Sequence, residues 1–490
     1  MDLRRIGLVV VLAFLALLVV NDVEGNSNIV FRVEHKFRGR RHGRGESMLA
    51  AMKAHDNHRH GRLLAAVDMP LGGNGSPTDA ALYFTKLSIG TPPKDYYVQV
   101  DTGSDILWIN CAGCDKCATK SSLGIDLTFY DLKTSSTGRS ISCDQDFCSA
   151  TFNALSSDCK TGMPCEYSVT YGDGSTTAGF FVRDNIKLDQ VSGNLQTNPI
   201  NGSIAFGCSV QQSGELSSSS ADSVDGIVGF GQANSSIISQ LASAGKVKKV
   251  FSHCLDGING GGIFAIGQVV QPKLKTTPLV PNELHYNVIM KAVEVGGDVL
   301  DMPTDVFGDE SGGGTIIDSG TTLAYLPDDI YVPFMRRILA AQPNLQTHTV
   351  EGQFKCFFYS GNVDDGFPAV TFHFEDSLSL TVYAHDYLFE VRDNEWCVGW
   401  MNKGMQTRDG REITLLGDVV LTNKLVMYDL ENQTIGWAEY NCSSSIKVRD
   451  EKSGNVYTVG AHVLSSADSL NRGLFLRFLL FFAIIYNLLH

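Results

Sequence analysis

The sequence predicts an all-β fold made of two similar lobes related by an internal pseudo-two-fold. From residue 82 onward, short runs of β-branched and aromatic residues alternate with Gly, Pro, Asn and Asp, which is typical of many short strands joined by turns. Helical stretches are few; the best candidates are residues 236–243 and 328–341, the second beginning with an aspartate cap. A short aspartate-containing motif occurs once in each half of the chain, which indicates the repeat.

Residues 1–25 have the composition of a secretory signal peptide. Arg4 and Arg5 precede the apolar run 6–20, and small residues near Gly25 offer a cleavage point. A membrane anchor is the weaker alternative, because the run is shorter than the roughly 20 residues that a spanning helix needs.

Residues 26–75 are predicted to be a propeptide that binds the rest of the chain. Residues 26–70 contain nine Lys/Arg, four Asp/Glu and five of the twelve histidines, whereas the whole chain has a net charge of −14. A basic leader is attracted to an acidic body, and the Gly-rich stretch 71–77 suggests a hinge beside a cleavage site. A disordered basic tail is the alternative. The acidic balance argues against a nucleic-acid partner.

The strand patterns divide between an N-terminal lobe, residues 76–280, and a C-terminal lobe, residues 281–445. In chain order they are residues 83–89, 96–100, 167–171, 203–206, 286–295, 370–374 and 425–429.

Each lobe contains the same ordered pair of motifs. Residues 101–104 (Asp-Thr-Gly-Ser) are followed by 225–229 (Asp-Gly-Ile-Val-Gly), and residues 318–321 (Asp-Ser-Gly-Thr) by 415–418 (Leu-Leu-Gly-Asp). One Asp-Thr-Gly alone is more often a plain turn. Two copies in the same order predict two equivalent loops that meet where the lobes join, which is where ligand sites tend to lie.

The paired loops predict a two-carboxylate catalytic site, with Asp101 and Asp318 as the acids. Two carboxylates about 3 Å apart cannot both ionise, so they share one proton and supply an acid and a base together. A water held between them could attack a peptide bond without any metal or cofactor. Which aspartate carries the proton is left open, because coupled acids titrate as a pair. The neighbours expected to support the carboxylates are Thr102, Gly103, Ser104, Ser319, Gly320 and Thr321.

These motifs resemble those of the pepsin-like aspartic proteases over residues 82–442, and more narrowly the atypical, nepenthesin-like plant branch. The matching stretches are DTGSDILW (101–108), YGDGS (171–175) and IIDSGTT (316–322). The cysteine-rich stretch between the first two resembles that branch's insertion, and the saposin-like insert of typical plant enzymes is absent. The resemblance implies a bilobal pepsin-like β-barrel fold with the active cleft between the lobes, endopeptidase activity on peptides or proteins, and a monomer.

The resemblance also assigns a flap over the cleft. Tyr171 lies between a strand pattern and Gly172-Asp173-Gly174, which is typical of a hairpin tip. Tyr171 is the flap tyrosine by resemblance, and the indole of Trp108 is expected to hydrogen-bond its hydroxyl. The alternative is that both are core aromatics.

Twelve cysteines behind a signal peptide predict disulfides. Nine lie within residues 111–254 and three within 356–442, so complete pairing requires at least one bridge between the halves. Within the second lobe we expect Cys356–Cys397, and the resemblance implies Cys208–Cys442 between the lobes. A zinc site formed by Cys111, Cys114 and Cys117 is disfavoured in an oxidising compartment.

The other expected modifications place the protein at the cell surface. Asn-X-Ser/Thr sequons begin at Asn74, Asn201, Asn234, Asn432 and Asn441. Residues 446–490 are predicted to be a linker and a glycosylphosphatidylinositol (GPI) signal, because the small residues from Ser465 precede a terminal apolar tail. Ser465 is the candidate attachment residue, although Arg477 interrupts the tail and a transmembrane or docking helix is the alternative. The expected location is the outer leaflet of the plasma membrane, reached through the secretory pathway.

Two other functions fit parts of the pattern. A catalytically dead relative would act as a secreted binding or inhibitor protein, but both aspartates and both following hydroxyls are intact. A glycosidase also uses two carboxylates, but these sit farther apart and do not need duplicated Asp-(Thr/Ser)-Gly loops.

Overall fold

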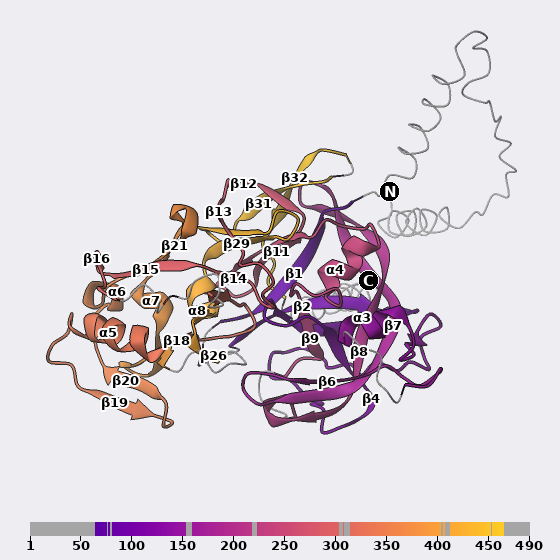
Figure 1. Ribbon diagram of the computed structural model, residues 1–490, viewed down its shortest axis with the longest axis horizontal. Helices are drawn as coiled ribbons and strands as arrows, with labels where there is room; N and C mark the ends of the chain where they lie inside the picture. The colour runs from indigo at the N-terminus through magenta and orange to yellow at the C-terminus, as the bar shows by residue number, and fades with distance from the viewer. Residues whose placement is uncertain are drawn as a thin grey trace, which may run out of the picture. The chain divides into compact units, whose positions relative to one another are not determined.

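The computed structural model describes residues 64–464, except for 76, 79–80, 153–158, 218–222, 303–306, 308–313, 403–404, 407–411 and 452 (Figure 1). The predicted signal peptide, nearly all of the predicted propeptide and the lipid-attachment region from Ser465 onward lie outside the described residues. Within the part that is described, no helix is both long enough and apolar enough to span a bilayer.

The fold is all-β, as the sequence predicts, and its largest sheet has 14 strands. Its order is β13-β30-β29-β10-β11-β1-β2-β3-β9-β4-β8-β7-β5, with β6 paired to β7. The strands are β1 (Val67–Asn74), β2 (Leu82–Ile89), β3 (Lys94–Asp101), β4 (Leu107–Asp115), β5 (Arg139–Ser140), β6 (Glu166–Thr170), β7 (Thr176–Gly193), β8 (Gln196–Ser213), β9 (Gly226–Gly229), β10 (Val250–Leu255), β11 (Gly262–Ile266), β13 (Lys275–Pro278), β29 (Lys424–Asp429) and β30 (Thr434–Glu439).

Smaller sheets make up most of the second half. The one that carries the second motif contains β14 (Asn287–Val288), β17 (Thr315–Ile317), β28 (Leu415–Leu416), β18 (Ala324–Leu326) and β25 (Trp400–Asn402). Two four-stranded sheets contain β16 (Asp298–Val299), β15 (Met290–Val295), β21 (Val370–Phe374) and β22 (Ser379–Val382), and β19 (Thr347–Val350), β20 (Phe354–Phe358), β24 (Glu395–Val398) and β23 (Leu388–Arg392). A two-stranded ribbon joins β26 (Met405–Gln406) to β27 (Glu412–Ile413).

Helices are short and few among the described residues. They are α3 (Asp146–Phe152), α4 (Ile237–Ser243), α5 (Asp328–Leu339), α6 (Val363–Gly366), α7 (Ala384–Tyr387) and α8 (Asp418–Leu421). Both predicted helices are present, as α4 and α5. The predicted aspartate cap of α5 is wrong: the cap residue is Pro327, and Asp328 and Asp329 instead occupy the first turn, where their charges suit the helix dipole.

The two halves of the chain share the large sheet. β10 of the first half pairs antiparallel with β29 of the second, from Val250 opposite Asp429 to Cys254 opposite Leu425. In Figure 1 the yellow-orange strand β29 accordingly lies among strands of the first half, close to β11. This shared sheet holds the two aspartate-bearing halves on one hydrogen-bonded framework.

Residues 71–74 of the stretch 71–77, which was predicted to be a hinge, belong to the strand β1, so the prediction is wrong for these residues. β1 pairs with both β11 and β2, and Val67, Met69 and Leu71 are buried. These apolar residues alternate with the period of a strand, and Gly72 allows Phe84 and Leu464 to approach closely. The end of the predicted propeptide is therefore part of the folded body.

The predicted linker also begins too early. A three-stranded sheet joins β12 (Gln268–Gln271) to β31 (Ser445–Arg449) and β32 (Val456–Gly460). Ile446 and Val448 are buried and alternate with polar residues, which is the pattern of a strand rather than of a linker. The chain then runs beside β1, where His462 forms an ion pair with Asp68.

All twelve cysteines form disulfides. The predicted Cys356–Cys397 pair is present, on the neighbouring strands β20 and β24. Three further pairs staple the cysteine-rich insertion: Cys114–Cys117, Cys143–Cys159 and Cys148–Cys165. A bridge between the halves exists, as the odd counts required, but the expected Cys208–Cys442 pair is wrong.

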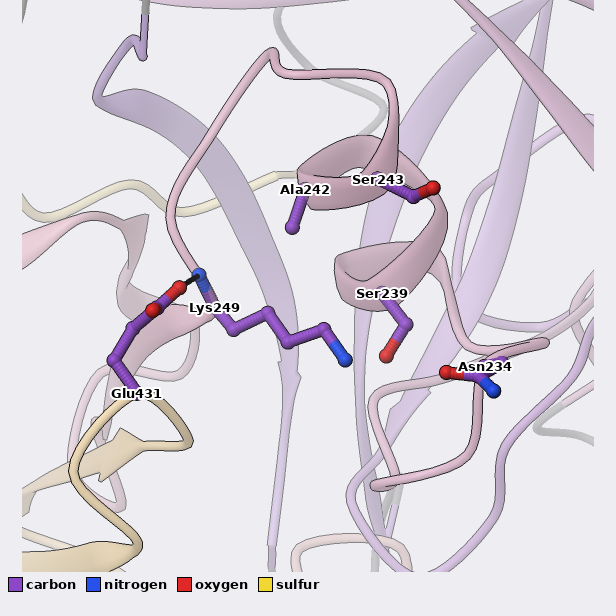
Figure 2. A pocket seen from close by; sticks show the side chains of 6 residues that line it. All are labelled: Asn234, Ser239, Ala242, Ser243, Lys249 and Glu431. Atoms are coloured by element: carbon purple, nitrogen blue, oxygen red, sulfur yellow. Dashed lines mark hydrogen bonds between the residues drawn. The ribbon is translucent and has the colours of Figure 1, made fainter.

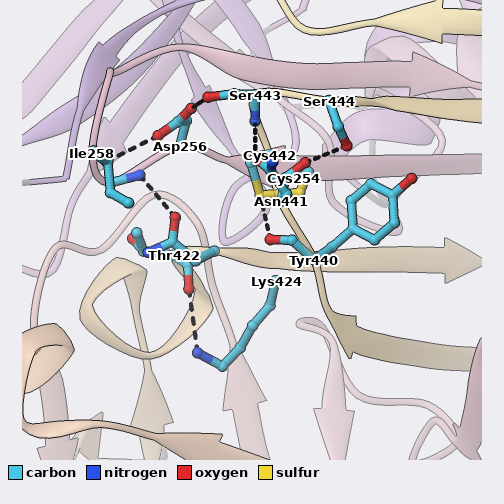
Figure 3. The surroundings of a disulfide bond; sticks show 12 residues. Cys254, Asp256, Ile258, Thr422, Lys424, Tyr440, Asn441, Cys442, Ser443 and Ser444 are labelled. Carbon is cyan, nitrogen blue, oxygen red and sulfur yellow. Dashed lines mark hydrogen bonds between the residues drawn. A yellow bond between two sulfur atoms is a disulfide. The ribbon is translucent and has the colours of Figure 1, made fainter.

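The bridge between the halves is Cys254–Cys442, with Cα atoms 5.2 Å apart (Figure 3). Cys208 instead pairs with Cys111, because β4 and β8 run parallel side by side and bring these two residues together. Cys442 follows β30 and returns beside the start of β29, which faces Cys254. Strand pairing therefore decides the connectivity.

Candidate active site

Both predicted aspartates lie at the end of a buried strand, and this strand pairs with the one that carries the second motif of the same half. Asp101 ends β3, which runs parallel to β9 and places Asp101 opposite Gly229. Asp318 follows β17, which runs parallel to β28 and places Ile317 opposite Leu416. The ordered pair of motifs in the sequence is thus one structural unit, built twice.

The two carboxylates face each other across the glycines of the loops. A β-carbon on Gly103 would lie within 2.6 Å of the Asp318 carboxylate, and one on Gly320 would overlap the Asp101 carboxylate. Only glycine allows this approach. Asp101 and Asp318 are 6% and 7% exposed, so both acids are largely withdrawn from water yet still reachable.

Each carboxylate accepts hydrogen bonds from an equivalent pair of donors in its own loop: a glycine N–H and a side-chain hydroxyl. The Gly103 N–H donates to Asp101 Oδ1 at 2.7 Å, and the Ser104 hydroxyl donates to Oδ2 at 2.5 Å. In the other loop, the Gly320 N–H and the Thr321 hydroxyl donate to Asp318, both at 2.7 Å. The structure therefore brings together the supporting residues that the sequence singled out.

Burial raises the pKa of Asp101 to about 7, and the negative charge of Asp318 adds to the increase. The bonds from Ser104 and Gly103 oppose this shift by stabilising the ionised form. A carboxyl group with such a pKa is protonated at acidic pH, as one member of a proton-sharing pair must be.

One hydrogen bond ties the two loops beneath the carboxylates. The Ser319 N–H donates to Thr102 Oγ1 at 2.8 Å, so the expected brace is present in this direction. The Ser319 hydroxyl has no hydrogen-bond partner among the described residues.

Tyr171 stands at the tip of a hairpin, as predicted. β6 and β7 pair up to Thr170 opposite Thr176, and the tip closes with a bond from the Gly174 N–H to the Tyr171 carbonyl at 3.0 Å. The Trp108 indole donates to the Tyr171 hydroxyl at 2.6 Å. Burial raises the pKa of Tyr171, and the nearby charge of Asp101 raises it further. Gly172 is exposed, and a β-carbon added to it would meet nothing within 4 Å, which leaves the tip open.

Three buried polar residues near the pair were not identified as functional from the sequence. Asp418, at the start of α8, is 1% exposed, and its pKa is raised well above the ordinary value by burial and then by the charges of Asp318 and Asp101. His253 and Tyr428 lie on the paired strands β10 and β29 and are completely buried. The signal in the sequence that could have identified the last two is a histidine and a tyrosine within mainly apolar strands.

Two surface hollows lie away from the paired carboxylates. One of about 370 Å³ (Figure 2) contains no paired carboxylates and is lined by Asn234, Ser239, Ala242, Ser243, Lys249 and Glu431. The described residues contain no cluster of three or more His, Cys, Asp or Glu side chains arranged for a metal ion. Four sequon asparagines, Asn201, Asn234, Asn432 and Asn441, are exposed, whereas Asn74 is half-buried in β1.

Comparison with known proteins shows which family the chain resembles. A family model described as xylanase inhibitor N-terminal matches residues 83–268, and one described as xylanase inhibitor C-terminal matches residues 285–439. The chain is 53% identical to Aspartic proteinase 36 of Arabidopsis thaliana over 474 residues, 96% of this chain and 95% of that protein.

More distant matches agree on the fold and the enzyme class. The chain is 28% identical to aspartic proteinase nepenthesin-2 of Nepenthes gracilis, over 74% of this chain and 78% of that protein. The crystal structure of edgp aligns with a TM-score of 0.61 at 20% identity, covering 77% of this chain and 95% of the other. At that identity the likeness speaks for the fold alone.

Proposed function

The chain belongs to the plant pepsin-like aspartic protease family and is an aspartic-type endopeptidase, and on this premise we propose that Asp101 and Asp318 are its catalytic pair. The observation that carries the proposal is the mutual approach of the two carboxylates, each against the glycine of the opposite loop.

In the proposed mechanism one proton is shared between the two acids. The ionised carboxylate takes a proton from a water bound between Asp101 and Asp318, and that water attacks the carbonyl carbon of the peptide bond. The protonated carboxylic acid donates to the carbonyl oxygen in the same step, so the charge on the oxygen is neutralised as it forms. The matched donors on both loops keep each carboxylate in place.

The tip of the β6–β7 hairpin is proposed to cover the two carboxylates. The Tyr171 hydroxyl accepts a hydrogen bond from Trp108, and the charge of Asp101 raises the pKa of Tyr171, so we place its ring on the side of the hairpin that faces the acids. A peptide held beneath such a tip is shielded from bulk water, and the tip must move for substrate to enter.

Acidic pH and removal of the leader are further parts of the proposal. The pKa of Asp101, about 7, favours a singly protonated pair below neutrality. The basic leader would release as its carboxylate partners become protonated and as its five histidines become charged and repel one another. Because β1 is built into the body, we place the cleavage before Val67 rather than near Ser76.

The surface location is also proposed. The N-terminal signal pattern directs the chain to the secretory pathway, and the tail beyond Ser465 directs attachment of a lipid that anchors it in the outer leaflet. Exposure of Asn201, Asn234, Asn432 and Asn441 fits glycosylation on that route.

Peptide cleavage between pH 3 and pH 6 tests the catalytic pair. Asp101→Asn and Asp318→Asn should each abolish cleavage, and a statine-type peptide inhibitor should block the wild type. Asp365→Asn, on the exposed face of α6, is the matched control and should retain activity. Wild-type rates in either active-site variant would refute the assignment.

A further inference from the structure

The second surface hollow is bordered by one of the sequon asparagines. Its volume of about 340 Å³ is near the lower end of the roughly 300–1,000 Å³ that ligand pockets occupy, so it has room for a small ligand. Its lining residues come from α7 and the residue before it, from the start of β29, and from the end of β30 and the residues that follow, Tyr440 and Asn441. Asn441 is exposed and is itself part of this lining.

The side-chain amide of Asn441 is held at its oxygen and not at its nitrogen. Oδ1 accepts the Ser443 N–H at 3.1 Å, whereas Nδ2 donates to no group in the described part of the chain. In the sequon at Asn432, by contrast, Nδ2 already donates to Asp429 at 2.7 Å. A sugar joined to Nδ2 of Asn441 would therefore break no hydrogen bond of the described structure and would start at the edge of the hollow.

A buried ammonium group also lines the hollow. Lys424, at the start of β29, is 2% exposed, and its ammonium donates to the Thr422 carbonyl at 3.2 Å (Figure 3). Asp386 Oδ2 is 3.7 Å away, which is beyond an ordinary hydrogen bond. An ammonium has three N–H donors, so two of them donate to no described residue. Because a buried charge is costly until its donors find acceptors, a ligand with oxygen atoms would be stabilised here.

An acceptor and an aromatic ring complete the lining. Glu439, at the end of β30, accepts the Tyr383 hydroxyl at Oε1 at 3.0 Å, and its other oxygen accepts from no residue that the structure describes. The Tyr383 ring is 38% exposed and stacks on His385, with ring centroids 5.6 Å apart and planes 4° apart. The hollow therefore offers a donor, an acceptor and a flat apolar surface of fixed orientation.

This mixture of charges indicates the class of ligand. An anionic ligand would meet the carboxylates of Asp386 and Glu439, and a cationic one would meet the ammonium of Lys424. A neutral ligand with several hydroxyl groups avoids both, because each hydroxyl can donate to a carboxylate and accept from an ammonium. An aromatic ring next to such groups suits a sugar, which has an apolar C–H face as well as its hydroxyls.

We propose that this hollow is a saccharide-binding subsite, and that its occupant is the first sugar of an N-glycan attached to Asn441. The inference rests on the proposed secretory route and glycosylation, and adds where one glycan binds. Cys442 is bridged to Cys254, and the Ser443 hydroxyl donates to Asp256 of the first half (Figure 3). A sugar bound in the hollow would therefore stabilise the chain at the covalent junction between the halves.

The test measures how fast glycans are removed from the native protein. The full chain is secreted from cells that add high-mannose glycans and is treated with an endoglycosidase that cuts between the first two sugars; mass spectrometry of glycopeptides gives the rate at each sequon. A bound sugar must leave the hollow before it is cut. Release at Asn441 should therefore be about tenfold slower than at Asn201, an exposed sequon on β8, which corresponds to about one net hydrogen bond. Equal rates at the two sequons would overturn the proposal.

Two variants test whether the slow release depends on the hollow. Tyr383→Ala removes the aromatic ring, and Lys424→Met removes the ammonium from a side chain of similar length; each should raise the release rate at Asn441 toward that of the exposed sequon. Phe358→Ala is the matched control and should change nothing, since Phe358 is also an exposed aromatic residue stacked on a histidine, His348, but does not line the hollow. Slow release that persists in both Tyr383→Ala and Lys424→Met would overturn the proposal, because general crowding would then explain it.

Sequon occupancy separates this proposal from the one on which it rests. A protein without glycans at any sequon would overturn both, whereas glycans at other sequons and none at Asn441 would overturn this proposal alone. In thermal unfolding of the glycosylated protein, Asn441→Gln and Tyr383→Ala should be less than additive, because both remove the contact between sugar and ring. Additive effects would overturn the bound sugar even where Asn441 carries a glycan.

Discussion

Replacing Gly103 or Gly320 by alanine should disable the active site without disturbing the fold. Neither glycine has a positive φ, so alanine introduces no backbone strain, and its effect is a direct collision with the opposite carboxylate. An added methyl group at residue 103 would lie within 2.6 Å of Asp318, whereas ordinary contacts begin near 3.4 Å. The carboxylate must therefore shift by roughly 1 Å, a displacement that costs on the order of 100-fold in rate.

The assay is kcat/KM for a peptide substrate at acidic pH, with thermal unfolding measured in parallel. Gly320→Ala should lose more activity than Gly103→Ala, because its methyl group would overlap the Asp101 carboxylate rather than crowd it. Gly172→Ala, at the hairpin tip, meets nothing within 4 Å and should stay within a few-fold of wild type. Near-wild-type activity of Gly320→Ala, with the protein folded, would refute the inference that the carboxylates face each other across these glycines.

Three further predictions concern stability and pH. Burial raises the pKa of both Asp101 and Asp225 to about 7, so the folded protein binds these protons more tightly than the unfolded chain. Stability should be fully present below about pH 4 and be lost as the pH rises through 7, which thermal unfolding between pH 3 and pH 8 checks; an unchanged melting temperature contradicts it. Asp418 is held neutral by its raised pKa, so Asp418→Asn should leave the activity profile between pH 3 and pH 6 nearly unchanged; a shifted optimum would indicate that it ionises. Removing the Cys254–Cys442 bridge, which closes a loop of 188 residues, by a double serine variant should cost about 5 kcal/mol in the chain-entropy account. Unfolding in denaturant measures this loss, and a difference below about 1 kcal/mol would mean that the shared β10–β29 sheet alone keeps the halves together.

Some of the predictions that succeeded depended on residues close together in sequence, and others on the family resemblance. Tyr171 was expected at a hairpin tip because the flanking strand pattern and Gly172-Asp173-Gly174 are local signals, and β6 and β7 pair as expected. The bond from Trp108 to Tyr171 agrees with the family resemblance. β31, by contrast, carries an equally local alternation around Ile446 and Val448, although these residues were predicted to belong to a linker.

The predictions that failed depended on which strands become neighbours. The resemblance suggested that Cys208 pairs with Cys442, but parallel pairing of β4 and β8 puts Cys111 beside Cys208. Residues 71–77 resembled a hinge because they are rich in glycine, yet residues 71–74 pair with β2 as the continuation of a strand whose first residues pair with β11. In each case a partner distant in sequence outweighed the local composition.

The sequence by itself determined the β-rich class, the duplication and the identity of the paired acids, because strand periodicity and the Asp-hydroxyl-Gly motif are properties of adjacent residues. Only the tertiary structure decided how close the two carboxylates come, which cysteines pair, and that the buried side chains of His253 and Tyr428 contact each other. These contacts form when β10 of one half pairs with β29 of the other. The physical reason is that burial and hydrogen bonding between strands depend on long-range register, which no short window of sequence contains.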